Sequence, residues 1–182
     1  MKATGIVRRI DDLGRVVIPK EIRRTLRLRE GTPLEIFTDR EGEIILKKYS
    51  PMVELTAFSG QYAEAMAQST GLIVCITDRD QVIAVAGGPK KDMIQKTISK
   101  QLEHVIGERS VVMSTKEEKA FISLTSEEME GITAQVIAPI ICEGDAIGSV
   151  SLLSREPKAK FGDMEVKLVM TAAGFLGRQM EA

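Results

Sequence analysis

The sequence predicts a mainly α+β fold with two domains, residues 1–50 and residues 51–182. Two observations carry this prediction: the first fifty residues read as short strands separated by turn signals, whereas longer apolar strands alternate with amphipathic helices after them. Ser50-Pro51 separates the two patterns, because serine is a favoured helix cap and proline a favoured first helical residue. A chain of 182 residues is long enough for two small domains.

The N-terminal domain is predicted to contain short strands and one helix. The strands are expected at residues 5–10, 15–18, 34–38 and 43–48, with turns at residues 11–14 and 39–42. Pro19 precedes a helix over residues 20–28, where Ile22 and Leu26 lie one turn apart on one face. Residues 1–50 have too few large apolar side chains to build a core of their own. We therefore expect this domain to be an obligate dimer.

The C-terminal domain is predicted to be a sheet flanked by helices. The expected order is a helix, two strands, a helix, three strands and a closing helix, at residues 52–69, 72–77, 81–86, 91–106, 120–124, 133–141, 146–153 and 163–180. Residues 107–119 are polar and are expected to be irregular. The closing helix is apolar on more than one face. We therefore expect helices 52–69 and 163–180 to pair between chains and to join dimers into a homotetramer.

The net charge of −1 hides a strong asymmetry along the chain. Residues 1–50 carry 12 Lys/Arg and 8 Asp/Glu, a balance of +4, whereas residues 51–182 carry 13 and 18, a balance of −5. Within residues 1–29, nine basic residues stand against three acidic ones. This asymmetry indicates a polyanionic partner for the N-terminal domain.

The run LGRVVIPKEIRR, from Leu13 to Arg24, resembles the swapped-hairpin DNA-binding domain of the AbrB family of transition-state regulators. The resemblance extends over residues 2–48 and implies that two chains interlock their hairpins and bind double-stranded DNA. The DNA-binding residues that it implies are Arg8, Arg15, Arg23 and Arg24, with Lys2, Arg9 and Lys20 as supporting phosphate contacts. Guanidinium suits this role because it is always charged and forks onto phosphate or guanine. On charge alone, a solvated basic face, or ion pairs with Asp11, Asp12 and Glu21, remains the alternative.

Residues 51–182 resemble, more loosely, a GAF domain, a sensor fold with an antiparallel sheet between helices. The chain length and the run AAGFL at residues 172–176 are similar to a sporulation regulator of the AbrB family, which implies activation and repression of sporulation genes. The GAF fold implies a pocket between the sheet and residues 93–119. It implies an unidentified small-molecule ligand, and no residues that bind a cofactor can be named.

No catalytic residue, metal site or cofactor is expected. His104 is the single histidine, and Cys75 and Cys142 lie apart in apolar runs that favour buried side chains over a disulfide. The run Gly87-Gly88-Pro89 lacks the spacing of a phosphate-binding loop, and it is typical of a turn between a strand and a helix.

The sequence also favours a cytoplasmic, nucleoid-associated bacterial protein. Its N-terminus has no signal-peptide pattern, and its longest uncharged run, residues 65–77, is shorter than the ~18 residues of a membrane span.

Two other functions compete with the DNA-binding regulator. The first is an antitoxin, because the swapped-hairpin module also occurs in antitoxins. The C-terminal tails of those antitoxins are short and disordered, whereas residues 51–182 are apolar enough to fold. The second is a sensor or an enzyme in which the N-terminal domain only dimerises.

Overall fold

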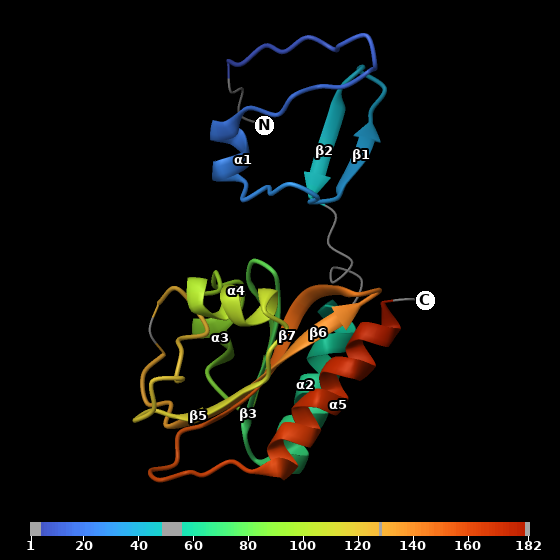
Figure 1. The fold of residues 1–182 in the computed structure, drawn as a ribbon. Helices are drawn as coiled ribbons and strands as arrows, with labels where there is room; N and C mark the ends of the chain where they lie inside the picture. Colours follow the sequence, from blue (N-terminus) through green and yellow to red (C-terminus); the bar gives the residue numbers. More distant parts are fainter. Residues whose placement is uncertain (1–4, 49–55, 128, 181–182) are drawn as a thin grey trace. The chain divides into compact units, whose positions relative to one another are not determined.

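A computed structural model of the chain describes residues 5–48, 56–127 and 129–180. Its contacts divide the chain into two compact units, residues 1–50 and residues 51–182 (Figure 1). No helix in the described ranges is both long enough and apolar enough to cross a membrane.

Unit 1 contains one short helix and one hairpin. The helix is α1 (Lys20–Thr25), and the antiparallel hairpin joins β1 (Leu34–Thr38) to β2 (Ile44–Lys48). The Asp39 carboxylate accepts hydrogen bonds from the main-chain N–H groups of Glu41 (3.0 Å) and Glu43 (2.9 Å), which closes the turn. Gly42 has a φ of +85°, so the predicted glycine turn and hairpin are confirmed.

Two predictions in unit 1 are wrong. Residues 5–10 and 15–18 form no strand, because within this part of the chain no further strand lies beside them to complete a ladder. The helix ends at Thr25 rather than at residue 28, since Arg27 takes a φ of +52° and Leu28 N–H bonds to the Arg23 carbonyl oxygen (2.7 Å). The predicted turn over residues 11–14 is present, with Gly14 at a φ of +76°.

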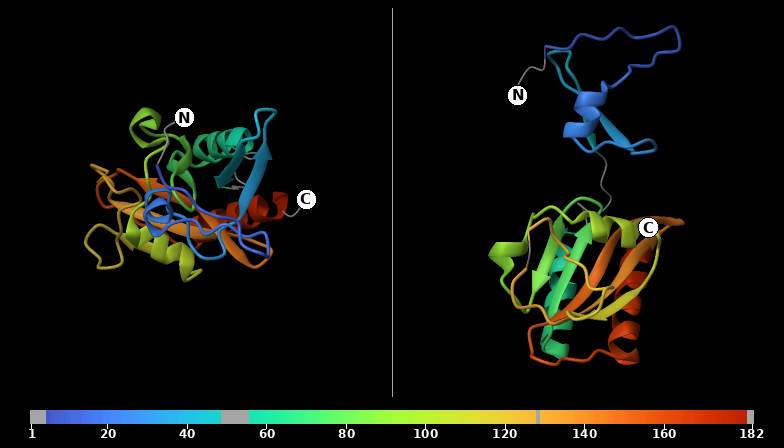
Figure 2. Two further views of the ribbon diagram at one scale, coloured as in Figure 1. Left: turned by 90° about the horizontal axis from the view of Figure 1, so that it is seen from above. Right: turned by 60° about the vertical axis from the view of Figure 1, so that its left-hand side comes forward.

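Unit 2 is built on a five-stranded antiparallel sheet with the strand order β4-β3-β7-β6-β5. The strands are β3 (Ile73–Asp78), β4 (Val82–Ala86), β5 (Val112–Thr115), β6 (Ala134–Cys142) and β7 (Asp145–Ser154). The helices are α2 (Thr56–Thr70), α3 (Lys90–Met93), α4 (Lys100–Gly107) and α5 (Asp163–Gln179). Helices α2 and α5 lie on one face of the sheet, and α4 lies on the other (Figures 1 and 2). The predicted α+β class is confirmed.

Both faces of the sheet are buried, which explains why its strands read as continuous apolar runs. Val74, Val150 and Leu176 belong to the core beneath α2 and α5, and Leu102 and Ile137 belong to the core beneath α4. A Cβ at Gly177 would collide with the main-chain oxygen of Ile141, so α5 packs directly on β6.

The predicted helices at both ends of unit 2 are confirmed where the structure describes them. Helix α2 ends beside Gly71, whose φ is +70°, and α5 spans nearly the whole predicted range. Residues 52–55, the start of the predicted helix 52–69, lie outside the described residues.

The predicted single helix over residues 91–106 is wrong. Gln95 has a φ of +62° and interrupts it, and the segment after α3 runs beside β4, with Val82 N–H bonded to the Lys96 carbonyl oxygen (2.9 Å). Ser99 then caps α4 by accepting from Leu102 N–H (3.0 Å). The apolar period identified buried residues, but the cap and the edge of the sheet determine where the helix begins.

The predicted third strand is misplaced. The polar segment 107–119 contains β5, which pairs with β6, whereas residues 120–124 form no strand. The main chain there is held by the buried Gln135 side chain instead. With its amide oriented to match its neighbours, Gln135 accepts from Ile122 N–H (2.8 Å) and donates to the Ile122 carbonyl oxygen (3.0 Å).

Candidate nucleic-acid interface

Six of the seven predicted DNA-binding residues lie in the described part of unit 1, and all six are exposed. They are Arg8, Arg9, Arg15, Lys20, Arg23 and Arg24. Lys2 lies outside the described residues. The six come from three segments: the extended run before the turn, the end of the turn, and α1. Exposed basic side chains are what phosphate contacts require.

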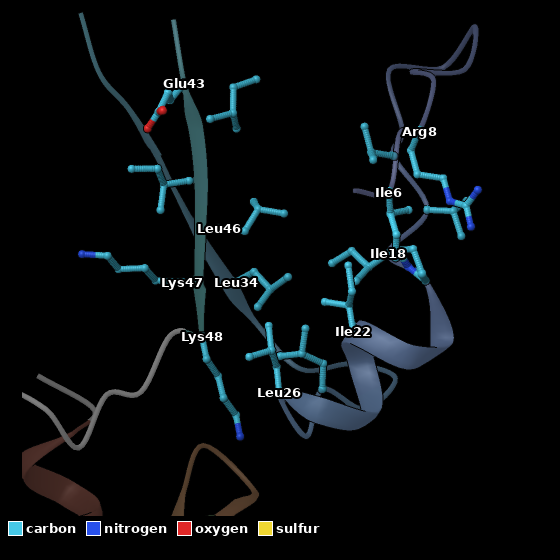
Figure 3. A pocket seen from close by; sticks show the side chains of 16 residues that line it. Ile6, Arg8, Ile18, Ile22, Leu26, Leu34, Glu43, Leu46, Lys47 and Lys48 are labelled. Carbon is cyan, nitrogen blue, oxygen red and sulfur yellow. The ribbon is translucent and has the colours of Figure 1, made fainter. Parts of the chain in front are cut away.

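Helix α1 sorts its side chains into a basic side and an apolar side. Ile22 is half-buried and points toward the hairpin, together with Leu26 after the helix (Figure 3). Arg23 and Arg24 lie in the last turn, where the helix dipole favours positive charge, and both are exposed. The local fold therefore presents this arginine pair to solvent.

The turn before α1 is organised by one carboxylate. Asp11 Oδ1 accepts from the main-chain N–H groups of Leu13 (3.0 Å) and Arg15 (2.7 Å), and Asp11 Oδ2 accepts from Arg15 Nε (2.8 Å). The main-chain bond from Arg15, and then the bond from its guanidinium, hold the pKa of the Asp11 carboxyl below its usual value. Among the six described candidates, Arg15 alone has a carboxylate within 4 Å.

Unit 1 also has a large open apolar cavity of about 1120 Å³ between α1, the extended segments and the hairpin. Ile18, Ile22, Leu34 and Leu46 point into it, and Arg8 lies at its border (Figure 3). Of all the residues described in unit 1, Pro19 alone is buried. Eleven large apolar side chains are exposed: Ile6, Val7, Ile10, Leu13, Val16, Val17, Leu26, Ile36, Phe37, Ile44 and Leu46. One chain therefore does not complete this unit.

Unit 2 contains a second cavity of about 480 Å³ beside the sheet. Its walls are mixed: apolar side chains such as Ile132 and Leu153 alternate with a polar lining that includes Gln101 of α4, Lys116, Glu130 and Gln135. The expected loop 107–119 contributes only Lys116, because most of the wall comes from residues 121–132, which sequence reasoning missed. A glutamine within the apolar run 134–142 was the available signal.

Cys75 and His104 occupy different environments in unit 2. Burial raises the pKa of the Cys75 thiol to about 12, so its thiolate is strongly disfavoured near neutral pH. His104 is exposed on α4. Within the ranges that the structure describes, no three His, Cys, Asp or Glu residues gather where a metal ion could bind.

The chain is similar to known proteins over both units. Residues 54–181 match the family described as stage V sporulation protein T C-terminal, transcription factor. Residues 7–53 match the family described as antidote-toxin recognition MazE, bacterial antitoxin.

Two curated relatives from Bacillus subtilis (strain 168) are similar in sequence. Stage V sporulation protein T is 54% identical over 181 residues, which cover 100% of this chain and 99% of that protein. Transition state regulatory protein AbrB is 65% identical over 51 residues, which cover 28% of this chain and 52% of that protein. The predicted resemblance of the N-terminal domain is confirmed.

A solved structure shows the fold of unit 2. The GAF domain from Acinetobacter phosphoenolpyruvate-protein phosphotransferase aligns with a TM-score of 0.57 and 13% identity, over 74% of this chain and 84% of that one. The predicted GAF-like sheet is therefore confirmed as a fold.

Proposed function

This chain belongs to the stage V sporulation protein T family, and from that membership we propose how its two units regulate transcription. The chain is a DNA-binding transcription regulator of sporulation. We assign DNA contact to residues 1–50, and oligomer assembly with ligand binding to residues 51–182. Contact with chromosomal DNA would place the protein at the bacterial nucleoid.

The single observation that supports the DNA interface is the exposure of all six described basic candidates on a unit that lacks its own core. A second chain that packs on the open apolar cavity would add its own copy of these basic side chains to the interface. We propose that Arg8, Arg15, Arg23 and Arg24 read the duplex, while Arg9, Lys20 and Lys2 contact phosphates. Phosphate contacts set the orientation of the protein, and arginine forks on base edges supply specificity.

DNA affinity should fall steeply with salt. Four arginines per chain in a dimer displace condensed counterions, so the logarithm of the binding constant should fall against the logarithm of salt with a slope of about −5 or steeper. Fluorescence anisotropy on a labelled duplex over a salt series measures the slope. A slope near zero would reject the DNA interface.

The antitoxin alternative draws on the match of residues 7–53, which describes the N-terminal module only. Residues 56–180 hold a five-stranded sheet with two buried cores, unlike a short disordered tail. Both this fold and the full-length relative favour the regulator.

We propose that the cavity of about 480 Å³ in unit 2 binds a small amphipathic ligand with a short aliphatic part and a charged end. This volume lies in the usual range for ligand pockets of ~300–1,000 Å³. Ile132 and Leu153 are buried apolar members of its wall, and Lys116 and Glu130 are exposed members with opposite charges.

Hexanoate should raise the melting temperature of the full-length protein, because a ligand that binds only the folded state stabilises it. The Lys116→Ala variant should lose this shift, because its ammonium would pair with the carboxylate. Glu130→Ala is the matched control and should keep it. Scanning calorimetry with and without hexanoate measures the shift. Equal melting temperatures in wild type at saturating hexanoate would reject the proposal for carboxylates, and hexylamine tests the opposite charge.

A further inference from the structure

We propose that Asp11 is a positioning residue for DNA binding, which holds the Arg15 guanidinium in the orientation that meets the nucleic acid. The inference rests on the proposed role of Arg15. The Asp11 carboxylate accepts hydrogen bonds from both the main chain and the side chain of Arg15. Asp11 Oδ1 accepts from the Arg15 main-chain N–H, and Asp11 Oδ2 accepts from Arg15 Nε.

The ion pair between Asp11 and Arg15 leaves the two terminal nitrogens of the guanidinium available for DNA. A guanidinium has five N–H donors, and the Nε bond to Asp11 uses one of them. The side chain of Arg15 is still 69% exposed, and that of Asp11 is 36% exposed. The two terminal nitrogens can therefore fork onto a phosphate or a guanine while Nε stays on Asp11.

Asp11 also fixes the main chain from which Arg15 projects. Gly14 N–H bonds to the Asp11 carbonyl oxygen (3.0 Å), and Asp11 N–H bonds to the Arg15 carbonyl oxygen (3.0 Å). Gly14 takes the positive φ that this tight turn needs. Asp11 therefore orders both the turn and the Arg15 guanidinium in the protein without DNA.

Charge alone makes the opposite prediction. A carboxylate on a basic surface repels phosphate, so removing it should tighten DNA binding. Preorganisation predicts weaker binding, because ordering a flexible side chain on association lowers affinity by roughly threefold to tenfold for each side chain. A dimer carries two such arginines, and single exposed charges are well screened at physiological salt, so we expect positioning to dominate.

Asp12 provides a matched control. It is the next residue, it is exposed, and no hydrogen bond to its carboxylate is present among the described residues. Asp12→Asn removes the same charge from the same turn without releasing Arg15. The variants Asp11→Asn and Asp12→Asn therefore separate the two effects by the sign of the change in affinity.

The experiment measures anisotropy of a labelled mixed-sequence duplex with full-length protein at physiological salt. Asp11→Asn keeps the Oδ1 acceptor for the turn, but its amide nitrogen faces Arg15 Nε as a second donor. It should weaken binding about tenfold, while Asp12→Asn should bind as tightly as wild type or more tightly. Within an Arg15→Ala background, Asp11→Asn should change affinity little.

Each other outcome has a defined meaning. Wild-type or tighter binding by Asp11→Asn would overturn the inference, and so would the same tenfold loss in the Arg15→Ala background, because Asp11 would then act through the turn alone. Unchanged binding by Arg15→Ala itself would reject the proposed role of Arg15. The Arg15 Nε–H signal in NMR spectra, protected from exchange in wild type and exposed in Asp11→Asn, reports the pair directly. Equal exchange in both proteins would count against it.

Discussion

DNA binding should fall about a thousandfold or more when Arg23 and Arg24 are both replaced by alanine. A dimer loses four guanidinium groups, and each well-placed arginine contact contributes about 1–3 kcal/mol of recognition. Both side chains are exposed on α1, and α1 itself buries no residue. The melting temperature should therefore stay within a few degrees of wild type, since exposed charges contribute little to stability. Anisotropy titration and scanning calorimetry measure the two quantities.

Arg40→Ala is the control for this loss of charge. Arg40 is an exposed arginine in the turn between β1 and β2 and is not part of α1, so its removal should weaken binding only modestly. A collapsed melting transition in the Arg23→Ala/Arg24→Ala variant would show that the pair is structural. Retained binding would move the interface elsewhere on unit 1.

Full-length protein should have the mass of four chains. Each chain would contact one neighbour through unit 1 and a different neighbour through unit 2. In unit 1, Leu46 lines the open apolar cavity and is 44% exposed in one chain. In unit 2, Phe175 of α5 stacks on Phe58 and Tyr62 of α2, with ring centroids 5.9 Å and 5.4 Å apart, and stays 37% exposed. We propose that a partner chain covers each of these surfaces, and two-fold symmetry then closes the assembly at four.

A single substitution in either interface should convert the tetramer to a dimer. Phe175→Asp should give a dimer that still binds DNA, whereas Leu46→Asp should give a dimer that does not, because a buried unpaired charge opposes association. Multi-angle light scattering measures the masses. Met113→Asp is the control: Met113 is 46% exposed on β5, away from α2 and α5, and its variant should remain a tetramer. A wild-type mass of two chains would reject the tetramer and leave DNA binding intact.

Local signals predicted the elements that depend on neighbouring residues. The hairpin turn follows from the Asp39 side chain and Gly42, and α2 ends where Gly71 takes a positive φ. The hairpin of β6 and β7 was predicted because both strands read as apolar runs joined by a short turn. Arg23 and Arg24 were placed on the exposed side of a helix by their spacing from Ile22.

The two failures in unit 2 share one physical cause, since both concern main-chain groups whose partners come from another part of the sheet. Residues 94–98 follow the edge of β4 rather than a helix, because Val82 supplies hydrogen bonds from another strand. Within residues 120–124, the main chain of Ile122 bonds to the side chain of Gln135 rather than to a strand. Hydrophobic period identifies which side chains are buried, but it does not identify which main chain lies beside them.

By itself, then, the sequence determined the turns, the buried apolar runs and the basic excess of the first unit. These properties depend on composition and on residues a few positions apart. Only the tertiary structure decided the strand order, the break between α3 and α4 and the wall of the unit 2 cavity. Those features depend on which side chains and strands meet in space, because burial and directional hydrogen bonds are satisfied across the fold rather than along the chain.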